Sequence, residues 1–188
     1  MDINSIKQMV DDSISKPEEE LKKELPALMD SFDNVNIVEL VKESPDLVPK
    51  LMGKLNEINI KSFIDDSPET SVKFMNLLWK SVPALAEKDS EASSRLAQAG
   101  EVTINFKADD SSMTSHLKIS DGKLSGGADL LSNAELSIFG PTDNIVGLLT
   151  GKVNPIQGFM AGKYKMDGNI SKGMQLSPFL TSITKLFA

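Results

Sequence analysis

Hydrophobic positions follow two different patterns along the chain, and the change falls near Ala99-Gly100. Before that point apolar residues recur every three or four positions, which is typical of amphipathic helices. After it they alternate with polar residues and are interrupted by glycine-containing turns, which indicates strands. The pattern therefore predicts an all-α region over residues 1–95 and a mixed region over residues 96–188.

Each predicted helix of the N-terminal region carries one apolar stripe, which needs a partner surface. The stripes are Leu21, Leu25, Leu28, Met29 and Phe32; Leu47, Val48, Leu51, Met52, Leu55 and Ile58; and Val72, Met75, Leu78, Trp79 and Val82. We interpret them as core that packs on itself and on the following region. A second hypothesis is that some of these helices form a movable cover over an apolar cavity. A membrane-surface helix is disfavoured, because such helices usually carry Lys and Arg on their polar face and these faces are acidic.

The N-terminal region also contains an internal repeat. A shift of 23 residues aligns 36–55 with 59–78, and seven of the twenty positions are identical. Each copy predicts a short helix, a break at Ser-Pro-acid and a second helix, with the side chain of Ser44 or Ser67 capping the second helix. A weaker copy over 5–13 brings the prediction to three helix pairs.

The C-terminal region predicts an α+β fold. Alternation indicates four strands, followed by a helix, a short helical turn, a fifth strand and a terminal helix; these lie at 102–107, 113–119, 124–130, 136–138, 142–150, 155–160, 163–167 and 170–187. Four strands in succession favour a five-stranded, mostly antiparallel sheet with helices on one face. Methionines are frequent at the expected core positions, and this flexible side chain suits variable filling.

The charge is unevenly distributed. Twenty Lys and Arg against 27 Asp and Glu give a net charge of −7, which argues against a nucleic-acid partner. Residues 1–95 carry 19 acidic and 12 basic residues, whereas residues 96–188 carry eight of each. The acidity therefore belongs to the helical region, and indicates a solvated or partner-facing surface that anionic membranes should repel.

Several classes of site lack the residues they need. The chain has no cysteine and one histidine, His116, which excludes disulfides and thiol nucleophiles and argues against a zinc site or a catalytic triad. His116 falls on the polar side of its strand, so we expect a surface histidine. Adjacent carboxylates such as Asp109-Asp110 are interpreted as turns, and we expect no metal, no cofactor and no enzymatic activity. No basic leader or 18-residue apolar run is present, so we expect a cytoplasmic protein.

A signature near the C-terminus identifies a family. Residues 150–169, TGKVNPIQGFMAGKYKMDGN, closely resemble the signature of the sterol carrier protein type 2 family, the non-specific lipid-transfer domain. The resemblance extends to the Asp-Gly turn within 119–123 and to Ala134-Glu135, and covers about residues 96–188. Gly158 departs from the family, which often has Ala there, and is expected to loosen its helical turn slightly.

The resemblance implies a five-stranded sheet backed by helices, with an apolar tunnel between them. Mapped onto this chain, the implied ligand-binding residues are Phe106, Leu117, Ile119, Leu136, Ile138, Leu148, Leu149, Phe159, Met160, Met166, Met174 and Leu180. The implied ligands are fatty acids, acyl-CoA, phospholipids or sterol-like lipids. Burial of apolar chains gains about 0.8 kcal/mol per methylene and needs few directed hydrogen bonds, so selectivity should be low.

The leading hypothesis is a lipid-binding or lipid-transfer protein whose N-terminal helices gate the tunnel and which makes at most transient membrane contact. One alternative is an interaction or dimerisation module in which the acidic helices bind a protein partner. Another is an accessory subunit that presents a lipophilic intermediate to a separate enzyme.

Overall fold

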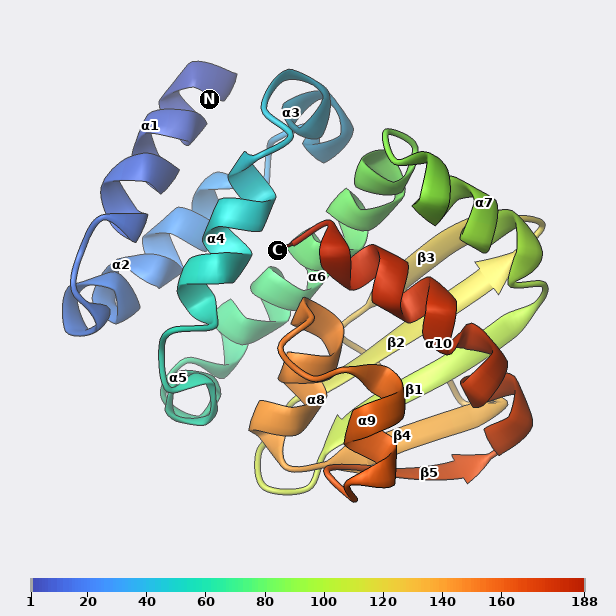
Figure 1. Ribbon diagram of the computed structural model, residues 1–188. Coiled ribbons are helices and arrows are strands. Elements are labelled where there is room, and N and C mark those ends of the chain that lie inside the picture. Colours follow the sequence, from blue (N-terminus) through green and yellow to red (C-terminus); the bar gives the residue numbers. More distant parts are fainter. Residues whose placement is uncertain (1, 188) are drawn as a thin grey trace.

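The computed structural model describes residues 2–187 and consists of a group of helices beside a sheet that is covered by further helices (Figure 1). The N-terminal helices are α1 (Ile3–Ile14), α2 (Glu18–Ser31), α3 (Ile37–Glu43), α4 (Leu47–Leu55), α5 (Ile60–Asp66), α6 (Pro68–Ala86) and α7 (Ser90–Gln98). The remaining elements are β1 (Val102–Ala108), β2 (Thr114–Ser120), β3 (Lys123–Gly127), β4 (Leu136–Gly140), α8 (Thr142–Thr150), α9 (Pro155–Met160), β5 (Lys165–Gly168) and α10 (Ile170–Lys185).

The helices α3 and α5, which are related by the 23-residue shift, have the same local geometry. Both are seven residues long, and the side chains of Asn36 and Asn59 accept a backbone hydrogen bond at their N-termini. Ser44 and Ser67 end these helices with similar dihedral angles. The expectation that these serines cap the following helices is wrong, because in the described chain neither α4 nor α6 has a side-chain cap.

The sheet has the strand order β3-β2-β1-β4-β5. Strand β1 pairs antiparallel with β2 and parallel with β4, while β2 with β3 and β4 with β5 are antiparallel. The prediction of a five-stranded, mostly antiparallel sheet is confirmed. The single parallel pair arises because the chain leaves β3 at one edge and returns on the far side of β1.

Helices from both regions cover one face of this sheet. The C-terminal helices α8 and α10 pack against β1 and β4, and the N-terminal helix α6 packs against β3 (Figure 1). The buried apolar residues of the two regions form one connected core. The apolar stripes predicted from sequence lie in this core, except that Val72 on α6 is 48% exposed.

Candidate functional site

The sheet face beneath α6, α8 and α10, called the covered face below, is built from rows of apolar side chains. The strand registers align Leu117, Ile104 and Leu136 in one row, and Ser115, Phe106, Ile138 and Met166 in the next. Successive residues of a strand point to opposite faces, so these rows share one face of the sheet. All are buried except Met166, which is partly buried.

The structure brings most of the predicted ligand-binding residues together. The six predicted sheet residues, Phe106, Leu117, Ile119, Leu136, Ile138 and Met166, belong to the covered face. Among the helix residues, Leu148, Leu149 and Leu180 are buried, while Phe159 and Met174 are partly buried. Met160 on α9 is placed elsewhere, because its side chain is 77% exposed on the surface.

Trp79 on α6 is a central residue that the predicted binding set omitted. Its ring stacks on Phe106, with 6.4 Å between the centroids and 28° between the planes. The indole Nε1 donates a hydrogen bond of 2.7 Å to the hydroxyl of Ser115, which donates in turn to the Gly127 carbonyl at 2.9 Å. An N-terminal helix therefore places its only tryptophan directly on the covered face.

Two sequence features anticipate this contact. Ser115 interrupts an otherwise apolar alternation on β2, and a buried hydroxyl there requires a partner. Gly126 on β3 leaves room for the indole, because a Cβ at this position would lie 2.6 Å from the Trp79 ring. Neither feature by itself identifies Trp79 as the partner.

Further polar links attach the N-terminal helices to the rest of the protein. The Asn76 side chain accepts a hydrogen bond of 3.1 Å from the backbone of Ala128. Asn56, at the end of α4, accepts from the Thr150 hydroxyl at 2.8 Å through its side chain and from Lys152 Nζ at 3.1 Å through its carbonyl. Thr150 and Lys152 belong to the family signature, so in this chain part of the signature anchors the helical region.

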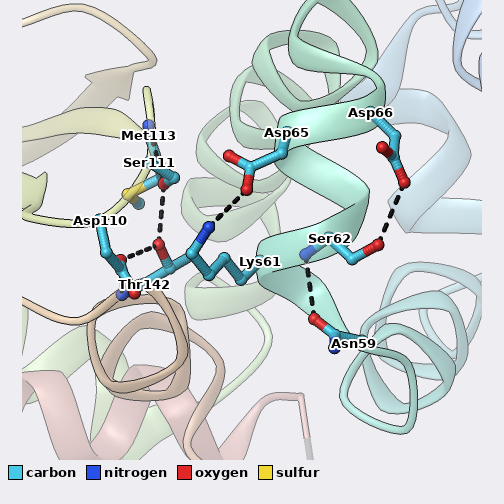
Figure 2. Close-up of polar contacts among 9 residues, drawn as sticks. All are labelled: Asn59, Lys61, Ser62, Asp65, Asp66, Asp110, Ser111, Met113 and Thr142. Atoms are coloured by element: carbon cyan, nitrogen blue, oxygen red, sulfur yellow. Dashed lines mark hydrogen bonds and ion pairs between the residues drawn. The ribbon is translucent and has the colours of Figure 1, made fainter.

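A polar cluster joins the β1–β2 turn to α8 and lies beside α5 (Figure 2). The carboxylate of Asp110 accepts hydrogen bonds from the backbone and hydroxyl of Thr142, the first residue of α8. These bonds lower the pKa of Asp110 and satisfy a helix N-terminus that has no cap of its own. On α5, the Asp65 carboxylate raises the pKa of Lys61, and Asp110 contributes to the same shift.

The signature segment around α9 is tightly packed. The Tyr164 hydroxyl donates to the Pro155 carbonyl, and burial raises the pKa of Tyr164 to about 12. A Cβ at Gly158 would lie 2.6 Å from Val153 Cγ1 and 2.9 Å from the Tyr164 ring. The glycine that departs from the family pattern therefore leaves the space that the side chains of Val153 and Tyr164 fill. The expectation that it loosens this turn is wrong, because the turn is closely packed.

Among the cavities where the N-terminal helices meet the C-terminal region, two have volumes of about 400 Å³ or more. One, of about 510 Å³, is bordered by the end of α6, by α7 and by the β2–β3 turn, and includes Leu96 and Leu124. The other, of about 400 Å³, lies between the α4–α5 connection and α8, with Lys152 and Lys163 in its wall. The first is the closer to the covered face, because Leu124 pairs with Ile119.

His116, predicted to be a surface residue, is only 14% exposed at its side chain. Its Nδ1 lies 3.0 Å from the backbone carbonyl of Asp129 and 3.2 Å from the Asp129 carboxylate. No group of three or more His, Asp and Glu side chains within residues 2–187 is arranged to hold a metal ion. None of the helices in that range combines the length and apolar character needed to cross a bilayer.

Comparison with known proteins identifies one family. Residues 82–181 match the family model described as the SCP-2 sterol transfer family. No curated protein sequence matches the chain.

Similar solved structures include two sterol carrier proteins and one ubiquinone synthesis protein. Sterol carrier protein 2 from Yarrowia lipolytica is 18% identical over 61% of this chain and 92% of that one, with a TM-score of 0.46. Sterol carrier protein domain 2 of Helicoverpa armigera is 20% identical over 60% and 87%, with a TM-score of 0.43. The UbiJ-SCP2 ubiquinone synthesis protein is 16% identical over 68% and 96%, with a TM-score of 0.37.

Proposed function

Because the chain belongs to the SCP-2 sterol transfer family, we propose that it binds and carries lipids between its covered face and the helices above it. The observation that carries this proposal is the pair of apolar rows centred on Ile104 and Phe106. Their only polar member, Ser115, is hydrogen-bonded to Trp79. Such a surface favours flexible apolar molecules and offers few groups for directed recognition. The ligand classes are fatty acids, acyl-CoA, phospholipids and sterol-like lipids.

Ligand binding requires the covering helices to move, because the predicted binding residues of the covered face are packed against protein side chains. We assign the moving part to α6. Releasing it breaks two hydrogen bonds to the sheet, from Trp79 to Ser115 and from Ala128 to Asn76, each with a net value of about 0.5–1.5 kcal/mol. It also withdraws the Trp79 side chain, at a cost of about 3–5 kcal/mol by analogy with truncation of a buried Trp. A lipid that buries about ten methylenes gains about 8 kcal/mol, which is of the same order as the loss of these three contacts.

The first experiment asks whether the protein carries lipid at all. Purified full-length protein is examined by native mass spectrometry and lipid extraction, before and after incubation with oleate. A co-purifying lipid or stoichiometric oleate supports the proposal. A protein that neither carries nor takes up lipid overturns it.

Trp79 provides a built-in reporter, because it is the only tryptophan and lies on the covered face. Oleate should change its emission. Met166→Lys, which places a charge on the covered face, should abolish this change, while Leu130→Lys at an exposed position should preserve it. Circular dichroism confirms folding of both variants. Unchanged oleate affinity in folded Met166→Lys would contradict the assignment of the covered face.

The role of α6 as a gate is tested by linking it to the sheet. The chain has no cysteine, so Asn76→Cys with Ala128→Cys introduces one pair of thiols, which is closed by oxidation or by a short bis-maleimide. The linked protein should lose oleate uptake, and the same protein with free thiols should retain it. Equal uptake rates for linked and unlinked protein would show that α6 is not the gate.

A further inference from the structure

The short helix α9 exposes apolar side chains. Ile156 is 46% exposed and Met160 is 77% exposed. They are four residues apart in one helix, so they lie on the same face. Single exposed apolar residues are common on proteins. A neighbouring pair that includes the most exposed large apolar side chain in the described chain requires a specific explanation.

This apolar pair lies in a cationic segment. Residues 151–166 contain three exposed lysines, Lys152, Lys163 and Lys165, and no acidic residue. None of these lysines forms an ion pair with another described residue, and Lys152 Nζ donates only to the Asn56 carbonyl. The acids beside these lysines are Asp143, in the wall of the adjoining cavity, and Asp167, two residues after Lys165 on β5, so the three lysines leave only a small positive excess around α9.

The rest of the charge distribution favours one orientation. The excess acidity lies in residues 1–95, and α1 and α2 lie on the side of the molecule away from α9 (Figure 1). Interactions between exposed charges are screened beyond about 8 Å at physiological ionic strength. A negative surface that meets α9 therefore attracts the nearby lysines, and α1 and α2 contribute little repulsion, although the α4–α5 connection borders Lys152 and Lys163.

We propose that α9 and its flanking lysines dock the protein on the surface of anionic lipid bilayers. Ile156 and Met160 enter the boundary between headgroups and acyl chains, and Lys163 and Lys165 lie at the level of the phosphates, while Lys152 donates to the Asn56 carbonyl. Apolar side chains beside lysines are typical of segments that lie on a membrane surface, so we take an anionic bilayer as the occupant. This inference goes beyond lipid carriage, and it depends only on the surface residues around α9.

The test is co-sedimentation of the full-length protein with vesicles. We expect binding to an equal mixture of phosphatidylcholine and phosphatidylglycerol, and much weaker binding to phosphatidylcholine alone. Removing one lysine charge, as in Lys163→Gln, should weaken binding about five-fold, since a lysine near an anionic surface contributes about that factor. Raised salt should weaken binding as well.

The apolar contribution is tested separately. Ile156→Ser combined with Met160→Ser should weaken vesicle binding, whereas Val38→Ser, at a 45% exposed position on the acidic helix α3, should leave it unchanged. Equal thermal unfolding of these variants excludes a folding defect. Absence of vesicle binding, equal binding to both vesicle types, or wild-type binding by the double variant would overturn the proposal. Oleate uptake, measured without vesicles, separates this failure from failure of the proposed function.

Discussion

The indole Nε1 of Trp79 donates a 2.7 Å hydrogen bond to Ser115 Oγ, and this bond joins helix α6 to strand β2. Trp79 precedes residues 82–181, which match the family model, so the contact joins a helix segment outside the matched range to a strand inside it. The helical region of this protein is therefore part of the layer that encloses the covered face.

The Trp79–Ser115 contact should be energetically coupled. Ser115→Ala leaves the buried indole N–H without an acceptor and should lower the free energy of unfolding by about 1–3 kcal/mol. In a Trp79→Phe background the same substitution should cost less, because the donor is gone. Urea unfolding followed by circular dichroism measures both, with exposed Lys80→Ala as the control. Equal costs in both backgrounds would show that the hydrogen bond does not contribute.

The same glycine-to-alanine change should have opposite effects at two positions. At Gly158 the new methyl group would lie 2.6 Å from Val153 Cγ1, so we expect a loss of about 1–3 kcal/mol in the free energy of unfolding. At Gly53, inside α4, nothing lies within 4 Å and alanine favours the helix, so we expect a gain of about 0.5–1 kcal/mol. Chemical denaturation of both variants provides the comparison. A stabilised Gly158→Ala would contradict the described packing.

The hydrogen bonds between Asp110 and Thr142 should make stability depend on acidity. They lower the folded-state pKa of Asp110 below its ordinary value of 3.8. The stabilisation is therefore present above that value and is lost as the pH falls through the lowered pKa. Urea unfolding between about pH 2 and 5 should show a shallower decline for Asp110→Asn than for the wild type. Asp109→Asn, whose side chain makes no hydrogen bond within the described chain, should follow the wild type.

Tyr164 is the only tyrosine, so its ionisation can be followed by ultraviolet absorbance without interference from another phenol. Burial raises its pKa from 10.0 to about 12 in the folded protein. The associated stability is present below pH 10 and is lost as the pH rises towards 12, because the unfolded chain releases its proton first. Protein unfolded in urea should titrate near the ordinary value. A folded protein that also titrates there would contradict burial of the hydroxyl.

Several features of the fold follow from short stretches of sequence. Alternation through Val102, Ile104 and Phe106 predicted β1, and the covered face contains the sheet residues that alternation and family resemblance selected. The start of α6 at Pro68 follows from the fixed backbone angle of proline. The capping role expected of Ser44 and Ser67 failed, because these residues adopt dihedral angles that end the preceding helix.

The position of Met160 shows where periodicity is insufficient. A methionine in a short apolar turn fits a core as well as a surface, and the packing of Tyr164 and Val153 around Gly158 decides which face of α9 turns inward. The placement of Trp79 has the same origin. Its helical stripe predicts burial, but not which surface covers it.

The amino-acid sequence by itself determined the α+β class and the family. Each of these depends on local spacing or on a contiguous signature. Only the tertiary structure decided that β4 lies parallel to β1, that α6 covers part of the sheet, and that Trp79 meets Ser115. These relationships join residues far apart in the chain through shape and mutual burial, and hydrophobic periodicity does not specify which distant surfaces pack together.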